Sequence, residues 1–106
     1  MTQSAIQDMP ILNEVLDMTA HSGTRSGLDP RTYFMVRIAA LAATGAGPGA
    51  WAVNLGTAAD VGLTREDVQS VLVAVAPVIG TARTVAAVGS ALRGVGLAAA
   101  IADTEE

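Results

Sequence analysis

Few side chains in this 106-residue chain could do chemistry, and they flank a Gly/Pro-rich break at residues 45–49. Tyr33 and Arg37 precede the break, and Asn54 follows it. Arg37 could bind a ligand carboxylate or lie along the surface over apolar neighbours, while Tyr33 or Asn54 could polarise a carbonyl group. An amide cannot shuttle a proton, and the break itself contains no thiol, imidazole or carboxylate. These residues leave open whether the chain is an enzyme.

Other candidates have a functional and a structural interpretation. Trp51, the only tryptophan, could line a ligand pocket or anchor the core or an interface. Asn54 could be a hydrogen-bonding group in a small pocket, a satisfied interface amide or an exposed residue. For Arg83 we expect an ion pair within or between chains, with Asp60 or Asp67 as its partner.

The remaining titratable side chains do not indicate a metal or cofactor site. His21 is the only histidine, and one imidazole cannot build a metal site alone. Glu66 and Asp67 follow Thr64 in a capping-box pattern, where the helix dipole favours negative charge. We therefore expect no metal and no cofactor.

The composition argues against several classes of protein. The net charge is -4 and the six basic residues, all arginines, are scattered, which argues against nucleic-acid binding. The absence of lysine removes Schiff-base catalysis, and the absence of cysteine removes disulfides and thiol peroxidase chemistry. The N-terminal stretch does not read as a signal peptide, so we expect a cytoplasmic protein. The Ala, Gly and Val richness, with arginine as the only basic type, is typical of a high-GC bacterial source.

The core must be built from small side chains, because hydrophobic residues make up 51% of the chain and aromatic residues only 3%. Such side chains let helices approach closely, but each of them buries little area. A monomer of this composition is expected to expose apolar surface, which favours self-association.

Hydrophobic periodicity predicts an all-α chain of about five helices joined by short loops. Asp29 and Pro30 open a helix that ends near Gly45, and Pro48 opens the next helix, which Gly62 closes. We divide the chain into an N-terminal helix and linker at 1–27 (the turn-rich linker at 21–27), a helical domain at 28–102 and an acidic tail at 103–106.

The last helix also permits a membrane interpretation. Residues 84–102 contain one charge, Arg93, and approach the roughly 20 residues that cross a bilayer. A charge in mid-span is costly, and neither basic flanks nor an aromatic belt accompanies this stretch. We therefore rank a small membrane-associated helical protein as the third hypothesis for function.

Four motifs follow one another between residues 28 and 93: LDPRT, AALAATG, AADVGLTREDVQSVL and VAPVIGTAR. In this order and spacing they resemble the carboxymuconolactone decarboxylase and alkyl-hydroperoxidase-D (AhpD)-like superfamily. Arg83 in the last motif matches the family's Gly-x-Pro-Arg ending. The resemblance implies an all-α subunit of AhpD-like fold that assembles into a homotrimer or homohexamer.

The site residues of that superfamily are absent from this chain. Redox members carry Cys-x-x-Cys, a histidine four residues after the second cysteine, and a glutamate twelve residues before the first. The resemblance places Gly47 and Ala50 at the cysteines, Asn54 at the histidine and Met35 at the glutamate. The decarboxylase branch lacks the cysteines but keeps the histidine. Because peroxide reduction needs a thiolate and a resolving thiol, we do not expect peroxidase activity.

The resemblance thus implies a homo-oligomer that lacks the redox site. Such a protein either binds a small apolar or carboxylated ligand or has a purely structural role. The alternative is a cysteine-free enzyme that acts on a small carboxylated lactone or related organic acid. Its reaction would resemble that of a decarboxylase, another lyase or an isomerase. The candidate catalytic residues are Asn54 and Tyr33. The candidate ligand-binding residues are Met35, Arg37, Trp51, Asn54 and Arg83.

Overall fold

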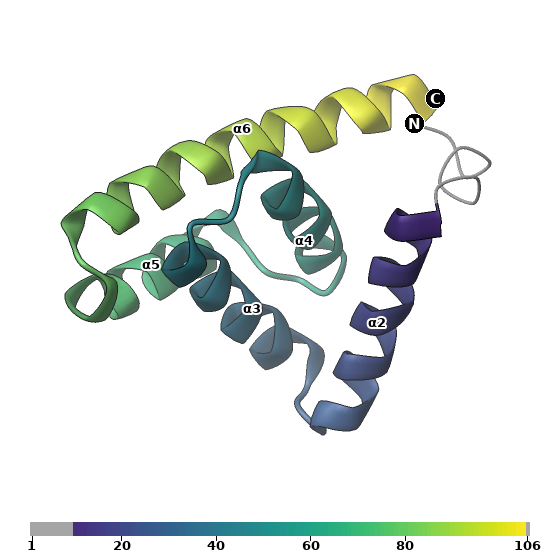
Figure 1. The fold of residues 1–106 in the computed structure, drawn as a ribbon, viewed down its shortest axis with the longest axis horizontal. Helices are drawn as coiled ribbons and strands as arrows, with labels where there is room; N and C mark the ends of the chain where they lie inside the picture. Colours follow the sequence, from purple (N-terminus) through teal and green to yellow (C-terminus); the bar gives the residue numbers. More distant parts are fainter. Residues whose placement is uncertain (1–9, 106) are drawn as a thin grey trace.

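The computed structural model describes residues 10–105, and for side chains residues 10–100. The regular structure in that range is entirely α-helical, which confirms the predicted all-α class. Figure 1 shows α6 along one edge of the molecule and α2 along another, with α3 and α4 between them. The helices are α2 (Pro10–Ser26), α3 (Pro30–Thr44), α4 (Pro48–Asp60), α5 (Arg65–Ile79) and α6 (Thr81–Glu105).

The ends of α3 follow from its flanking residues. Asp29 is the N-cap, and its carboxylate accepts hydrogen bonds from the backbone N–H of Thr32 (3.1 Å) and from the Thr32 hydroxyl (2.6 Å). Pro30 occupies the first turn, where its missing N–H has no intrahelical partner to lose. Gly45 ends the helix at φ 70°, a left-handed conformation that glycine adopts readily. The helix therefore begins and ends where the sequence predicts.

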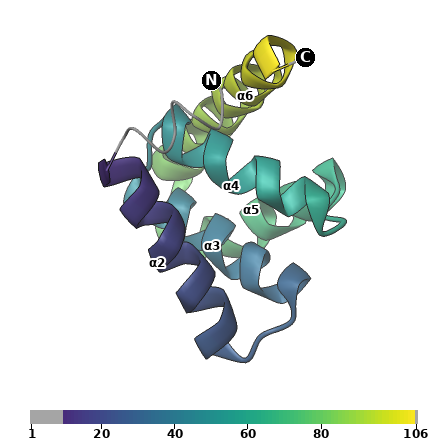
Figure 2. The same cartoon turned by 90° about the vertical axis from the view of Figure 1, so that its right-hand side faces the viewer.

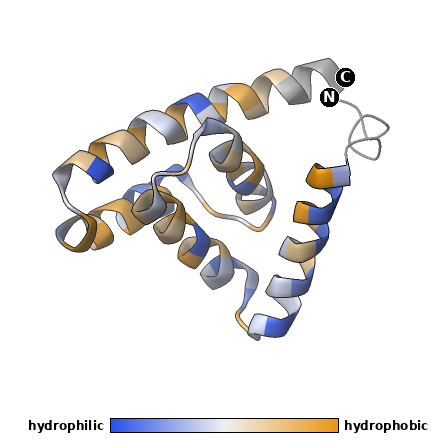
Figure 3. Cartoon of the chain, in the orientation of Figure 1, coloured by the Kyte–Doolittle hydropathy of each residue, from blue (hydrophilic) through white to orange (hydrophobic). Residues whose placement is uncertain are grey.

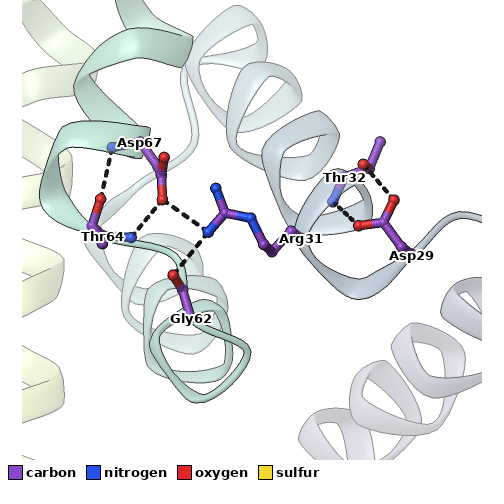
Figure 4. Close-up of polar contacts among 6 residues, drawn as sticks. All are labelled: Asp29, Arg31, Thr32, Gly62, Thr64 and Asp67. Atoms are coloured by element: carbon purple, nitrogen blue, oxygen red, sulfur yellow. Dashed lines mark hydrogen bonds and ion pairs between the residues drawn. The ribbon is translucent and has the colours of Figure 1, made fainter.

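A hydrogen-bonded corner joins α3 to the start of α5 (Figure 4). Thr64 and Asp67 form the predicted capping box: the Asp67 N–H donates to the Thr64 hydroxyl (3.1 Å), and the Thr64 N–H donates to the Asp67 carboxylate (2.9 Å). Arg31 of α3 donates to the same carboxylate (3.1 Å) and to the Gly62 carbonyl (2.9 Å). The capping box thus fixes the first turn of α5 and ties it to α3.

Loss of the Thr64 cap should have a measurable effect on stability. Thr64→Ala should lower the free energy of unfolding by about 1 kcal/mol, the usual loss when an N-cap hydroxyl is removed. Thr57→Ala is a matched control, because the Thr57 hydroxyl bonds only to the Val53 carbonyl within its own exposed helical turn and alanine is the better helix former. Urea denaturation measures both. Equal losses in the two variants would contradict the capping role.

Acid should weaken the same corner. Hydrogen bonds from the Thr64 backbone and from Arg31 hold the pKa of Asp67 below its ordinary value of 3.8, and bonds from the Thr32 hydroxyl and backbone do the same for the pKa of Asp29. A lowered folded-state pKa gives stability that is present above the ordinary pKa and is lost as the pH falls through the lowered value.

We therefore expect the melting temperature to fall as the pH drops below about 4. The fall should be shallower in Asp67→Asn, which has no carboxyl group to titrate at this position. A thermal melt followed by circular dichroism at several pH values measures this slope. Identical slopes in wild type and variant would show that Asp67 does not contribute.

The N-terminal helix is longer than predicted. The turn-rich linker predicted at 21–27 is wrong, because α2 remains helical as far as Ser26. Gly23 lies against the ring of Tyr33, where a Cβ would stand 3.6 Å from Cε2. This packing on α3 stabilises a segment whose glycine and serine content disfavours a helix. The chain turns only at Gly27, where φ is 70°.

The crossing of α4 and α6 forms the centre of the core. Trp51 of α4 and Ile38 of α3 are the largest fully buried side chains of the core. Gly94 of α6 faces α4 so closely that a Cβ would lie 2.7 Å from the Cβ of Trp51. Only glycine lets the two helices approach to this distance. Trp51 therefore anchors the core, in agreement with its structural interpretation rather than with its ligand-binding one.

Apolar side chains remain exposed on α2 and α6, among them Ile11 and Leu92. Figure 3 shows orange bands of hydrophobic residues along both helices. Among the described helices α2 contacts α3 alone, and none of its residues is fully buried. Figures 1 and 2 both place it at one side of the molecule, away from α5. Across residues 10–105, no helix, α6 included, combines the length and the apolar character needed to cross a membrane.

Candidate functional site

Arg37 lies at the centre of a polar cluster that joins α2, α3 and α4. Its Nε donates to the Oδ1 of Asn54 (2.6 Å), and its terminal nitrogens donate to the hydroxyl groups of Tyr33 (2.8 Å) and Thr19 (3.4 Å). The guanidinium carbon lies 5.3 Å from the centre of the Tyr33 ring, within cation–π range. We call Thr19, Tyr33, Arg37 and Asn54 the arginine cluster. It brings together three residues that the sequence singles out.

The two helices on either side of the break position this cluster. Tyr33 and Arg37 are four residues apart on α3 and therefore share one face. The break turns the chain so that α4 packs against α3, which brings Asn54 to that face. Asn54 is only 6% exposed, and its amide nitrogen donates to the Ala50 carbonyl one turn earlier (2.8 Å). Both the oxygen and the nitrogen of this side chain are therefore bonded.

The cluster is positively charged and its internal partners are neutral. Arg37 contributes a guanidinium cation, and within residues 10–100 the ion pair that forms is Arg31 with Asp67 (3.1 Å), which leaves Arg37 without a carboxylate. The Tyr33 hydroxyl also donates to the backbone carbonyl of Thr19 (3.0 Å). This arrangement suits an anion.

No metal site accompanies the cluster in the described part of the chain. Among those residues, no three His, Cys, Asp or Glu side chains gather where they could hold a metal ion. The cluster itself offers hydroxyl, amide and guanidinium groups, and a guanidinium cannot act as a metal ligand because it has no lone pair to donate.

The positions that the resemblance assigns to the redox cysteines fall at the N-terminus of α4. Gly47 is the N-cap, and Ala50 lies three residues further on; both are exposed. A helix N-terminus lowers the pKa of a thiol and suits a reactive thiolate. Met35, at the position of the glutamate, is half-buried and packs against the core. The N-terminus of α4 would therefore suit thiol chemistry, but Gly47 and Ala50 carry no thiol.

Trp51 and Arg83 lie outside the arginine cluster. The Nε1–H of buried Trp51 has no hydrogen-bond partner among the described residues. The predicted ion pair of Arg83 with Asp60 or Asp67 does not form within the described part of the chain, where Arg83 instead donates to the Ala43 carbonyl in the last turn of α3 (3.2 Å); a pair between chains stays a prediction. The physical reason is that the last carbonyls of a helix carry partial negative charge and attract a cation.

Sequence reasoning missed Thr19. Its hydroxyl donates to the Val15 carbonyl (2.9 Å) and accepts from Arg37. The sequence gives only a weak indication that Thr19 faces the core: Leu12, Leu16 and Thr19 recur at helical spacing along the half-buried face of α2. Nothing in that spacing indicates Arg37 as the partner, since the contact depends on how α2 packs on α3.

Two cavities adjoin these helices. The smaller, of about 260 Å³, lies between α2 and α3 and shares Thr19 and Tyr33 with the arginine cluster. The larger is an apolar groove of about 610 Å³ between α4, α5 and α6, and none of its lining residues belongs to the arginine cluster. The groove is lined by Leu55, Ala58, Ala59, Leu63, Thr64, Arg65, Val68, Gln69, Leu72, Val88, Ala91, Leu92 and Val95.

The helix order and the unit formed by α3, the break and α4 define a class of small all-α proteins with an AhpD-like fold. The chain belongs to the carboxymuconolactone decarboxylase family, whose family model matches residues 11–92. The match begins within α2, whereas the motifs that carry the resemblance begin at residue 28. No curated protein and no solved structure matches the chain.

Proposed function

We propose that this chain is a homo-oligomeric member of its family that lacks the redox site and acts by binding a small molecule or as a structural protein. The observation that supports this most directly is the bonding of Asn54. At the position where the resemblance expects a histidine, a buried amide is bonded to Arg37 and to the Ala50 carbonyl. Such an amide fixes Arg37 in place and moves no proton.

The cavity between α2 and α3 supports the binding role. Its volume of about 260 Å³ is close to the lower end of the range for small-molecule pockets, roughly 300 Å³. Leu28 and Phe34 give it apolar walls, and Tyr33 and Thr19 give it polar groups. These features suit a small, largely apolar ligand, and a carboxylate on that ligand would lie one side chain away from Arg37.

The wild-type protein should not turn over an organic hydroperoxide in the presence of a dithiol reductant, because it contains no thiol. The double variant Gly47→Cys with Ala50→Cys is the matched control, since it places two thiols at the N-terminus of α4. Absorbance of the oxidised dithiol measures turnover. Any turnover by the wild type, of a hydroperoxide or of a carboxylated lactone, would overturn the proposal.

A cysteine-free enzyme acting on a small carboxylated lactone or related organic acid is the second candidate. The observation that favours it is the charge of Arg37, which only neutral groups contact within the described residues. In this candidate Arg37 binds the carboxylate of the substrate, and Asn54 or Tyr33 polarises a carbonyl. It predicts that Arg37→Ala and Asn54→Ala each abolish turnover while the assembly persists. Full activity in both variants would contradict this assignment of residues.

A further inference from the structure

We propose that the outer face of α2 in one copy of this chain docks into the apolar groove between α4, α5 and α6 of a second copy. We call the three residues of that face, Ile11, Val15 and Met18, the α2 stripe. This inference rests on the proposed self-association and specifies the two surfaces that make the contact.

Two apolar faces run along α2, and its own chain covers only one of them. Leu12 and Leu16 are half-buried on the face that packs toward α3. Ile11, Val15 and Met18 follow one another at i, i+4 and i+7 and form a separate stripe. Ile11 is 82% exposed and Met18 61% exposed. Three large apolar side chains in a row on one exposed helix face are typical of an interface.

The groove presents a stripe of the same length. Val88, Leu92 and Val95 on α6 also occur at i, i+4 and i+7, line the groove and are exposed. Each stripe extends over eight residues, or seven steps of 1.5 Å, which is about 10 Å of helix. The buried part of the groove wall is formed by Ala58, Leu63, Leu72 and Ala91. A helix laid along α6 would therefore place its stripe over an apolar surface of matching length.

Charge complementarity favours a second copy as the occupant. Arg65 is the charged residue among those that line the groove. Glu14 borders the α2 stripe, because it is three residues from Ile11 and four from Met18. Within residues 10–100 neither Glu14 nor Arg65 forms an ion pair. Docking would bring the glutamate to the rim of the groove where the arginine lies.

The α2 helix of the same chain does not occupy the groove. It packs on α3, and both views of the molecule place it away from α5 (Figures 1 and 2). The contact therefore joins the stripe of one copy to the groove of another, and we propose that it repeats head to tail, as a heterologous contact does. A heterologous contact that closes generates a ring, and a ring is what a homotrimer needs.

The test compares wild type, Met18→Asp and Val73→Asp by native mass spectrometry and by light scattering after size-exclusion chromatography. Met18→Asp should raise the dissociation constant of the assembly by on the order of 100-fold, because it places a charge in an apolar contact. Val73 is a matched control, since it is also an exposed apolar residue (73%, against 61% for Met18) and lies outside the groove. Val73→Asp should assemble like wild type. Circular dichroism checks that all three proteins are equally helical.

A charge exchange provides a second, independent test. Arg65→Glu alone and Glu14→Arg alone should each weaken the assembly, and the two together should restore it. Arg65 is the first residue of α5, where a glutamate is favoured by the helix dipole, so folding is not at risk. A monomeric wild type would overturn both the proposed assembly and this contact. A wild-type oligomer that is unaffected by Met18→Asp, or lost in Val73→Asp, would overturn the contact alone.

Discussion

Gly94→Ala should lower the free energy of unfolding by about 2–3 kcal/mol, the upper part of the range of about 1–3 kcal/mol seen when a methyl group is forced into a filled core. The added Cβ would lie 2.7 Å from the Cβ of Trp51 and 3.0 Å from both the backbone nitrogen of Ala52 and the backbone oxygen of Pro48. Two of these three neighbours are main-chain atoms of α4, which cannot rotate away as the end of a side chain can. The variant must therefore push α4 and α6 apart.

The matched control is Gly96→Ala, two residues further along the same helix. No heavy atom lies within 4 Å of the Cβ that it would add, so only helix propensity changes, and stability should rise by roughly 0.5–1 kcal/mol. Urea denaturation of the two variants side by side measures the difference. If both variants gain stability equally, the close crossing of α4 and α6 is not present in the protein.

Breaking the bond between Arg37 and Asn54 should have the second large effect. Arg37→Met removes the donor to a buried amide oxygen, and Asn54→Leu removes the acceptor of the guanidinium Nε. A hydrogen bond to a charged group contributes about 1.5–3 kcal/mol, and leaving its buried partner unsatisfied accounts for much of the loss. We therefore expect each single variant to lose about 2 kcal/mol of unfolding free energy.

A double-mutant cycle isolates the pair itself. The variant with both substitutions should lose less stability than the sum of the two single variants, by about 1–2 kcal/mol, because neither group is then left unpaired. Equilibrium denaturation of the four proteins gives this coupling. Losses that simply add would show that Arg37 and Asn54 act independently, which would contradict their 2.6 Å contact.

The helix ends could be predicted from the sequence because their signals are local. Asp29 caps α3 through bonds to a residue three positions away, and Thr64 and Asp67 cap α5 in the same way. Gly45 ends α3 through its own backbone conformation. Each of these depends on residues within one turn, so no knowledge of the tertiary structure was needed.

The extent of α2 could not be predicted because it depends on packing. Gly23 and its polar neighbours read as a turn by composition. They are helical in the structure, where Gly23 packs beside the Tyr33 ring, and only the position of α3 determines that contact. The bond from Arg83 to the Ala43 carbonyl is a second example, since it joins residues forty positions apart.

The candidate site was partly visible in the sequence. Tyr33 and Arg37 are placed on one face by their spacing of four residues, which requires nothing beyond a helix. The bond from Arg37 to Asn54 crosses the break, so it depends on how α4 packs against α3. Thr19 enters from a third helix, and the sequence contained no signal that paired it with Arg37.

Native mass spectrometry of the purified wild-type protein, without detergent, tests the central claim most directly, because it reports subunit number and retained ligand together. We expect a homotrimer or homohexamer. An additional small mass would identify the ligand of the proposed binding role, and a bare oligomer would favour the structural one. A monomer at micromolar concentration would contradict the claim and leave the α2 stripe and the apolar groove without their proposed partner.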